Sequence, residues 1–232
     1  MAALIGITVY RNLDEGGYYI PDGYVESVRQ AGGIPLLLTP GETRLNQVLR
    51  TIHGIIFAGG GDMDPALYGG SNHPTIERVD TVRDTFEIDL AKRLFKLNTP
   101  VLGICRGFQL LAVASGSQMI SHIPEEIGEA VIHKDPGGDS VRHPVTLEPD
   151  SRLANITGSK EFEVESEHHQ AIRNVTDEWQ IVASASDGII EAMEHKHHPW
   201  MISVLWHPEM SIDEAEQQRI FRAFVAAAEQ LK

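Results

Sequence analysis

The stretch Val101-Leu-Gly-Ile-Cys105-Arg-Gly107-Phe-Gln-Leu-Leu111 decides how the rest of the chain is interpreted. Apolar residues precede the cysteine, helix-compatible residues follow it, and a glycine stands two positions away on either side. This spacing is typical of a nucleophile elbow, a tight strand-to-helix turn that presents a nucleophile to a cleft. Backbone N–H dipoles at the start of the helix would favour the thiolate. A buried structural cysteine is the alternative, and the two glycines favour the nucleophile.

Around this stretch, short apolar runs alternate with amphipathic segments through the first half of the chain. Such alternation predicts crossover units and an α/β fold, with a mostly parallel, flavodoxin-like central sheet and helices on both faces. The predicted strands cover residues 4–9, 34–38, 55–58 and 101–104, and the predicted helices cover 21–31, 42–50 and 83–97. The third helix carries an apolar stripe at helical spacing, made of Phe86, Leu90, Ala91, Leu94 and Leu97.

The second half contains five apolar runs with few helices between them, which predicts a small antiparallel extension. These strands are expected at 141–147, 161–164, 180–185, 189–193 and 201–205. A final helix is predicted over 213–231, where Ser211 and Glu214 resemble a capping box. No linker of Ser, Gly or Pro separates the halves, so residues 1–232 are expected to form one domain.

Composition limits the function classes. Nineteen Lys and Arg against thirty-three Asp and Glu give the 232-residue chain a formal charge of −14, which disfavours binding to nucleic acid or to anionic membranes. A single cysteine excludes an internal disulfide framework and multi-cysteine metal sites. The sequence shows no export signal and no apolar stretch long enough to span a bilayer. A cytoplasmic location is therefore expected.

A candidate general base for the nucleophile, His207, lies near the end of the chain. The apolar run 201–206 leads into His207-Pro208-Glu209. In an extended segment residues two apart project to the same side, so the imidazole and the carboxylate can face one cleft. The carboxylate would then fix the imidazole tautomer. A histidine at a strand end beside a solvated glutamate is the alternative.

A glycine run, Gly59-Gly60-Gly61, follows the third predicted strand. Without Cβ atoms, its backbone N–H groups can approach a bound oxygen. The run lacks the spacing of a Walker loop or a dinucleotide fingerprint. An oxyanion hole shared with the Arg106 amide suits a cysteine site better, and a plain tight turn is the alternative.

These blocks occur in the order and at the separations typical of class I glutamine amidotransferase-like proteins. More narrowly, residues 4–227 resemble the γ-glutamyl-γ-aminobutyrate hydrolase family. The further matching features are Asp64-Pro65, Leu67-Tyr68-Gly69, Arg83-Asp84, Ser166-Glu-His168-His169-Gln170-Ala-Ile172 and Ser186-Asp187-Gly188-Ile-Ile-Glu191.

The resemblance implies a role for each matched position. It implies Cys105 as nucleophile, His207 as general base and acid, Glu209 as its orienter, and the Gly60 and Arg106 amides as the oxyanion hole. It places Gly59, Gln109, His168, His169 and Gln170 near the bound glutamyl group; a buried helix glutamine and a surface pair of histidines are the alternatives. Relatives often carry Asn where this chain has Glu165, which would alter leaving-group preference if the side chain faced the cleft.

The implied activity is hydrolysis of small γ-glutamyl amines, as in putrescine catabolism, through a γ-glutamyl thioester. The resemblance implies no metal ion and no organic cofactor, and a homodimer as a possible assembly. Other γ-glutamyl peptides or folate polyglutamates would use the same chemistry. A glutaminase subunit that supplies ammonia to a separate synthetase is one alternative function, and a catalytically silent binding module is another.

Two further clusters of polar residues are predicted to have no catalytic or metal-binding role. The histidines of His195-Lys-His197-His198 are expected in a solvated hairpin loop, because they lack ligand spacing on a defined element. Glu125, Glu126 and Glu129 are expected on an exposed charged face.

Overall fold

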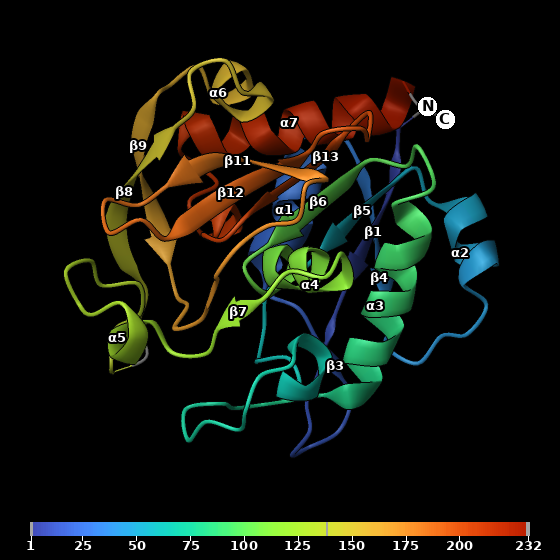
Figure 1. The fold of residues 1–232 in the computed structure, drawn as a ribbon. Coiled ribbons are helices and arrows are strands. Elements are labelled where there is room, and N and C mark those ends of the chain that lie inside the picture. Colours follow the sequence, from blue (N-terminus) through green and yellow to red (C-terminus); the bar gives the residue numbers. More distant parts are fainter. Residues whose placement is uncertain (1, 138, 231–232) are drawn as a thin grey trace.

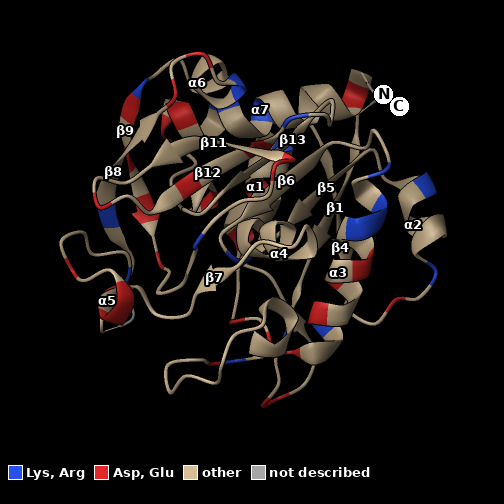
Figure 2. Ribbon diagram, in the orientation of Figure 1, with Lys and Arg blue, Asp and Glu red and all other residues tan. Residues whose placement is uncertain are grey.

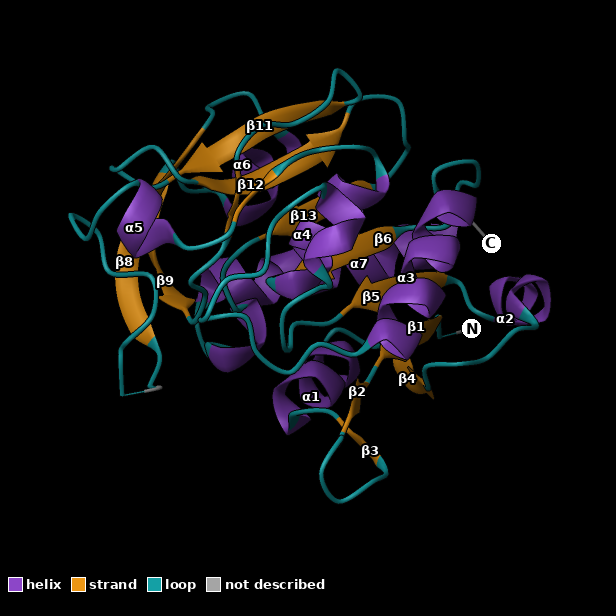
Figure 3. Ribbon diagram, turned by 60° about the horizontal axis from the view of Figure 1, so that its bottom comes forward, coloured by secondary structure: helices purple, strands orange, loops and turns teal. Residues whose placement is uncertain are grey.

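The computed structural model describes residues 2–137 and 139–230. One nine-stranded sheet runs through it, in which the strands from β4 across to β13 are parallel while the remainder are antiparallel (Figures 1 and 3). This confirms the predicted fold class. Across the sheet the order is β4 (Ile34–Leu38), β1 (Leu4–Thr8), β5 (Gly54–Phe57), β6 (Val101–Ile104), β13 (Met201–Val204), β12 (Ile190–His195), β11 (Trp179–Ser184), β8 (Val141–Leu147) and β9 (Glu161–Ser166).

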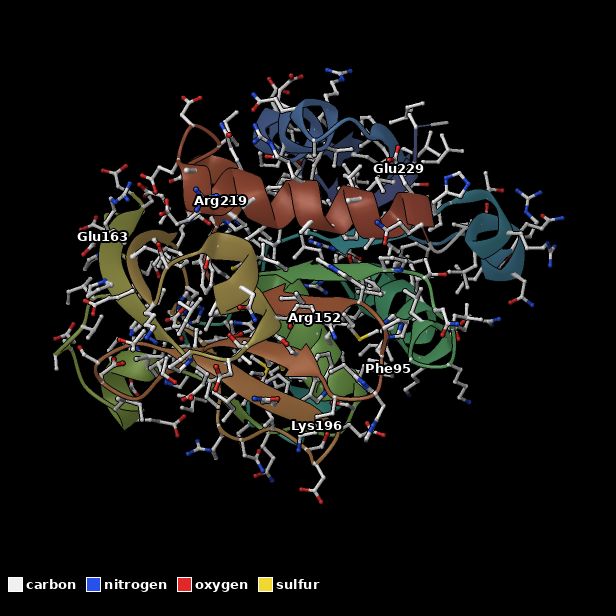
Figure 4. All side chains as sticks on the ribbon, turned by 90° about the horizontal axis from the view of Figure 1, so that it is seen from above. Phe95, Arg152, Glu163, Lys196, Arg219 and Glu229 are labelled. Carbon is white, nitrogen blue, oxygen red and sulfur yellow. The ribbon has the colours of Figure 1, made fainter. Side chains whose placement is uncertain are left out.

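Helices cover both faces of the sheet. On one face lie α1 (Asp22–Gln30), α6 (Arg152–Thr157) and α7 (Ala215–Gln230), and on the other lie α2 (Leu45–Thr51), α3 (Thr81–Leu94) and α4 (Arg106–Ala114). Because strand side chains alternate between faces, Ile56 packs with the first group of helices and Phe57 with the second. Arg219 of α7 donates to the Thr157 carbonyl, so α6 lies against α7 (Figure 4).

Smaller elements complete the chain. They are β2 (Tyr10–Arg11), β3 (Tyr18–Tyr19), β7 (Met119–Ile120), β10 (Ala171–Ile172), α5 (Ile123–Glu126) and two short 3-10 helices, Pro65–Tyr68 and Pro208–Met210. β7 pairs with β10, which brings the segment after α4 next to the segment after β9. This pairing assembles one wall of the site described below.

Two local predictions are wrong at helix ends. Helix α3 ends at Leu94 and turns back through a hydrogen bond from the Leu97 amide to the Leu94 carbonyl, so Leu97 lies beyond the stripe and is 41% exposed. Helix α7 begins at Ala215, and the Glu214 side chain bonds Arg142 on β8 instead of returning to Ser211. The predicted capping box is therefore absent from this described helix start.

The prediction of a solvated histidine loop is also wrong in part. β12 extends to His195, whose buried ring lies 5.1 Å from the Trp179 ring and 5.9 Å from the Phe95 ring. His198 is buried as well, and its Nδ1 accepts the Trp200 amide. The strand pairing with β11 draws these rings inward, and only His197 of the three is exposed.

The surface carries many acidic side chains, as the net charge of −14 predicts (Figure 2). Acidic positions are spread over both halves of the fold (Figure 2), and Glu125, Glu126 and Glu129 are exposed as predicted. Glu125 pairs with His73 at 3.0 Å and Glu126 pairs with Arg173. Among the helices described, none combines the length and the apolar character that a bilayer crossing requires.

The sheet topology explains where a site can form. Chain connections move outward from β1 to β4 and then return to β5 on the other side of β1. In open α/β sheets, ligands bind at the carboxyl ends of strands near such a reversal. The carboxyl ends of β5, β6 and β13 lie side by side there. The segments that follow these strands carry the glycine run, Cys105 and His207.

Candidate active site

Cys105 occupies a strained turn between β6 and α4. Its backbone has φ 51° and ψ −107°, a region that non-glycine residues rarely adopt. The turn requires the neighbouring glycines: a Cβ on Gly107 would lie 2.1 Å from the Phe57 carbonyl oxygen, and one on Gly103 would lie 2.9 Å from the Ser203 Cβ. The Cys105 amide donates to the Val204 carbonyl at 2.9 Å, which ties the turn to β13. The local geometry is that of a nucleophile elbow.

His207 and Glu209 meet through a hydrogen bond of 2.6 Å between Nδ1 and Oε1. Both side chains are buried. The His207 amide donates to the Glu165 carbonyl at 2.8 Å, which fixes the backbone of the turn. The predicted pairing of imidazole and carboxylate is therefore present, and the bond leaves Nε2 as the nitrogen free to exchange a proton.

The imidazole and the thiol approach each other over the glycine run. A Cβ on Gly59 would lie 3.1 Å from His207 Cε1 and 3.5 Å from Cys105 Cβ. Burial disfavours a charged imidazole, but the nearby Cys105 and Glu209 outweigh this effect and hold the pKa of His207 well above its usual range. A charged His207 is the partner that a Cys105 thiolate needs.

The residues predicted to supply the oxyanion-hole amides lie near Cys105: Gly60 lines the same cavity, and Arg106 follows Cys105 at the start of α4. Gly59 donates its N–H to the buried Tyr24 hydroxyl at 2.9 Å and so is engaged. The next residue, Gly60, has φ +132°, and a Cβ there would lie 2.4 Å from Arg83 Nη1. The Arg106 N–H is the first amide of α4 and has no acceptor within the helix. The structure places both predicted residues beside Cys105.

A buried ion network that the sequence motifs do not predict lies next to these residues. Arg106 pairs with Asp84 and Glu87 of α3, and Arg83 Nε donates to Glu87 at 2.9 Å. Arg83 also donates to the carbonyls of Ala58 and Gly59, at 2.9 and 2.8 Å. Although burial opposes ionisation, the two guanidinium groups lower the pKa of Glu87. The signal in the sequence was three charged residues at helical spacing on a face of α3 that is otherwise apolar.

A cavity of about 280 Å³ opens beside the thiol. Its walls include Cys105, His207, Gly60 and the charged side chains of Arg78 and Lys134. A second cavity of about 590 Å³ shares both of these cations. The carboxylates of Glu77 and Glu167 also line both cavities. The two cavities therefore adjoin at a wall of mixed charge, next to a candidate nucleophile.

Four of the five predicted glutamyl-binding residues line this cavity, and Gly59 is not among its lining residues. Gln109 and Gln170 border the cavity, and Gln109 Nε2 donates to the Gln170 carbonyl at 3.3 Å. His169 also borders it, with Nε2 3.1 Å from Asp62 Oδ2. His168 lines the cavity too, and its Nε2 lies 3.6 Å from Glu191 Oε1. Glu165 is not among the residues that line either cavity, and its carboxylate lies 3.1 Å from Arg142.

One group among the described residues could hold a metal ion. His133, His143, His168 and Glu191 bring their donor atoms within 4.8 Å of one another, and all four are buried. The sequence motifs predict no metal site. The signal was present in two quoted blocks, which contain His168 and Glu191, but His133 and His143 belong to neither.

Comparison with known proteins matches residues 3–209 to the model of the Peptidase C26 family. A Mycobacterium tuberculosis protein provisionally named a glutamine amidotransferase is 36% identical over 97% of this chain and 74% of that protein. The γ-glutamyl-γ-aminobutyrate hydrolase of Escherichia coli O157:H7 is 29% identical over 97% of this chain and 93% of the enzyme.

A solved structure shows the same fold. It is a Thermoplasma acidophilum protein provisionally described as one subunit of a GMP synthase, with a TM-score of 0.69 and 18% identity, covering 99% of this chain and 96% of that chain. The family match extends over the glycine run, the elbow and the His207–Glu209 pair. The chain belongs to the Peptidase C26 family, within the class I glutamine amidotransferase-like proteins.

Proposed function

We propose that this protein hydrolyses the γ-glutamyl amide bond of small γ-glutamyl amines, releasing glutamate and the free amine. The observation that carries the proposal is the convergence of a strained Cys105 with the His207–Glu209 pair, whose Nδ1–Oε1 distance is 2.6 Å. A silent binding module would have no need to retain backbone strain at a lone cysteine. The name of the Escherichia coli relative supports the γ-glutamyl class of substrate.

The reaction would proceed in two halves through a thioester. Cys105 Sγ attacks the γ-carbonyl carbon, and the Gly60 and Arg106 amides receive the oxyanion, each contributing about 3 kcal/mol in comparable sites. The charged His207 then gives its Nε2 proton to the departing amine as the C–N bond breaks. Water, deprotonated by the now neutral His207, attacks the γ-glutamyl thioester and releases glutamate.

An arginine at the cavity wall, Arg78, suits the substrate. A γ-glutamyl group carries an α-carboxylate, and Arg78 lines both cavities without an ion pair to any described carboxylate. Its backbone has φ 54°, and Gly61 packs so closely that a Cβ there would lie 2.5 Å from the Arg78 Cβ. Strain at a cavity wall is a feature of ligand-contacting positions. We therefore assign Arg78 to the α-carboxylate, while the adjoining cavity receives the amine portion.

The test is a substrate panel with matched isomers. Purified protein should release amine from γ-glutamyl-γ-aminobutyrate and related γ-glutamyl amines, and should leave the α-glutamyl isomers intact. Cys105→Ala should abolish release while its circular dichroism spectrum stays unchanged. Arg78→Met should raise KM more than it lowers kcat. Turnover that survives in Cys105→Ala, or equal cleavage of both isomers, would refute the proposal.

The same assay separates the competing activity. A glutaminase subunit would release ammonia from glutamine, and more of it when a synthetase subunit is added. We also propose that the substrate is a small molecule and that the protein binds neither nucleic acid nor membranes. We further propose that it is cytoplasmic and forms a homodimer. Sedimentation of the purified chain measures the last of these directly.

A further inference from the structure

The cluster of His133, His143, His168 and Glu191 is built from four separate segments of the chain. His133 lies in the loop before β8, His143 on β8, His168 just after β9 and Glu191 on β12. Their exposed fractions are 4%, 4%, 3% and 0%. Four polar side chains from distant segments meet where apolar residues would ordinarily fill the interior.

The atoms at the centre of the cluster have no hydrogen-bond partner among the described residues. These atoms are His133 Nδ1, His143 Nε2, His168 Nε2 and both carboxylate oxygens of Glu191. Buried polar atoms are nearly always hydrogen-bonded, because burial without a partner costs free energy. One ligand atom from each of the four residues lies within 4.8 Å of the other three, which indicates that another group completes them.

The separations between Glu191 and the three histidines are close to those of a tetrahedral metal centre. Glu191 Oε1 lies 3.3 Å from His133 Nδ1, 3.7 Å from His143 Nε2 and 3.6 Å from His168 Nε2. Four ligand atoms placed about 2.0–2.2 Å from a tetrahedral ion are about 3.3–3.6 Å apart. The same separations are long for direct hydrogen bonds, which prefer about 2.9 Å.

The outer nitrogen of each histidine fixes the tautomer that metal binding needs. His133 Nε2 lies 2.9 Å from Asp187 Oδ2, His168 Nδ1 lies 3.1 Å from the Gln170 carbonyl, and His143 Nδ1 lies 3.3 Å from the Pro144 carbonyl. Each acceptor requires a proton on the outer nitrogen. A neutral ring then directs its inner lone pair at the centre, as metal-binding histidines do when a carboxylate or carbonyl orients them.

We propose that these three histidines and Glu191 bind one divalent transition-metal ion, with zinc as the preferred occupant. Imidazole nitrogen and carboxylate oxygen are the ligands that zinc accepts in tetrahedral sites, and four protein ligands make a closed site with no open coordination position. The ion would therefore stabilise structure and take no part in bond cleavage. The site is independent of the proposed hydrolysis, which uses Cys105.

The ion would stabilise one wall of the substrate cavity. The His133 carbonyl accepts the Ser166 hydroxyl at 2.7 Å and the His168 amide at 3.0 Å, which joins the loop before β8 to the segment after β9. The Gln170 carbonyl accepts both His168 Nδ1 and Gln109 Nε2. A metal on His168 would thus fix the segment that carries His169 and Gln170 into the cavity.

The decisive experiment measures metal content and affinity without using activity. Because Cys105 and His207 could themselves bind zinc, the full chain is studied as Cys105→Ala. It is freed of metal with a chelator and then titrated with Zn²⁺ by calorimetry and with Co²⁺ by visible absorption. We expect one equivalent of either ion, the intense absorption bands of tetrahedral Co²⁺, and a higher Tm when zinc is bound.

Variants locate the site. In the same background, Glu191→Gln and His143→Gln should each weaken zinc binding by at least about 100-fold, and Asp187→Asn by about 10–100-fold, because it removes the group that orients His133. His195→Gln is the matched control, since it alters another buried histidine and should bind zinc as the parent does.

Two results would overturn the proposal. One is a parent protein that binds no stoichiometric zinc and shows no change in Tm, in which case protons shared between the histidines and Glu191 complete the cluster. The other is unchanged affinity in Asp187→Asn together with a spectrum that lacks the tetrahedral bands. Failure of a ligand variant to fold leaves the parent titration and Asp187→Asn to decide. None of these outcomes depends on whether γ-glutamyl amines are substrates.

Discussion

Replacing Glu87 by Gln tests whether the ion network beneath the active site is needed for stability. Glu87 is fully buried and receives Arg83 Nε at 2.9 Å, and it also pairs with Arg106. The amide keeps the shape of the side chain but removes its charge. Asp84 then remains as the carboxylate partner of Arg106, while Arg83 keeps the carbonyls of Ala58 and Gly59 as acceptors.

The expected loss is large because the charges stay buried. Removing one partner of a buried ion pair costs about 3–5 kcal/mol, since the remaining charge is left without compensation. An amide oxygen still accepts one hydrogen bond, which places Glu87→Gln near the lower limit, at about 3 kcal/mol. With a denaturant slope of about 3 kcal/mol per molar urea, the unfolding midpoint should fall by about 1 M.

A surface pair on the same helix is the matched control. Asp89 lies 3.1 Å from Arg93, but its side chain is 52% exposed. Exposed pairs contribute about 0–1 kcal/mol, so Asp89→Asn should move the midpoint by no more than about 0.3 M. Urea unfolding at pH 7, followed by circular dichroism, measures both variants. Equal midpoints for Glu87→Gln and Asp89→Asn would refute the reasoning.

The same variant has a pH signature with a definite sign. The fold lowers the pKa of Glu87 below its usual 4.5, because Arg83 and Arg106 outweigh the effect of burial. A carboxyl group with a lowered pKa contributes stability above its unfolded pKa and loses it as the pH falls through the folded value. The stability difference between the parent and Glu87→Gln should therefore shrink below about pH 4.5.

Three further predictions concern single positions. Gly107→Ala should destabilise the protein by at least about 2–3 kcal/mol, because the new Cβ would lie 2.1 Å from the Phe57 carbonyl oxygen; a Tm equal to that of the parent would contradict this. Glu209→Gln should lower kcat by about 10³–10⁴-fold through loss of the charged partner of His207, whereas Glu163→Gln, on the exposed part of β9, should leave it unchanged. Burial and the nearby His195 lower the pKa of His198 to about 4, so its protonation should cost stability as the pH falls from about 6.5 towards 4. His198→Asn should therefore reduce that pH dependence by about 1–3 kcal/mol in acid unfolding measurements.

The sequence predicted the elements of the sheet well because each strand is a short apolar run between turn residues. The predicted run at 101–104 coincides with β6, and that at 34–38 coincides with β4. Ends of elements were less predictable, as the exposed Leu97 shows, because local turns override an apolar pattern. The order of the strands across the sheet depends on contacts between distant segments, which periodicity does not record.

In the candidate site, too, residues in local motifs were predictable from the sequence, and residues that depend on contacts between distant segments were not. Cys105, Gly60 and His207 each follow a strand end, so local motifs located them. The residues that hold them were missed. Glu87 lies one turn beyond the noticed Arg83 and Asp84, and charged residues on a helix ordinarily indicate a solvent-exposed face. Only the fold shows that α3 turns this face towards α4.

Two buried polar clusters therefore flank the cavity, and their placement follows from the shape of the site. Loops at strand ends carry few apolar side chains, so packing alone cannot hold them. The ion network around Glu87 fixes the start of the glycine run, because Arg83 donates hydrogen bonds to the carbonyls of Ala58 and Gly59. The cluster around Glu191 contacts another part of the cavity wall through His168. Burying the charged and polar groups of each cluster costs desolvation free energy. In exchange, each cluster fixes the positions of groups that must align with Cys105. A substitution in either cluster should therefore change the alignment of the cavity walls even where the catalytic residues themselves are intact.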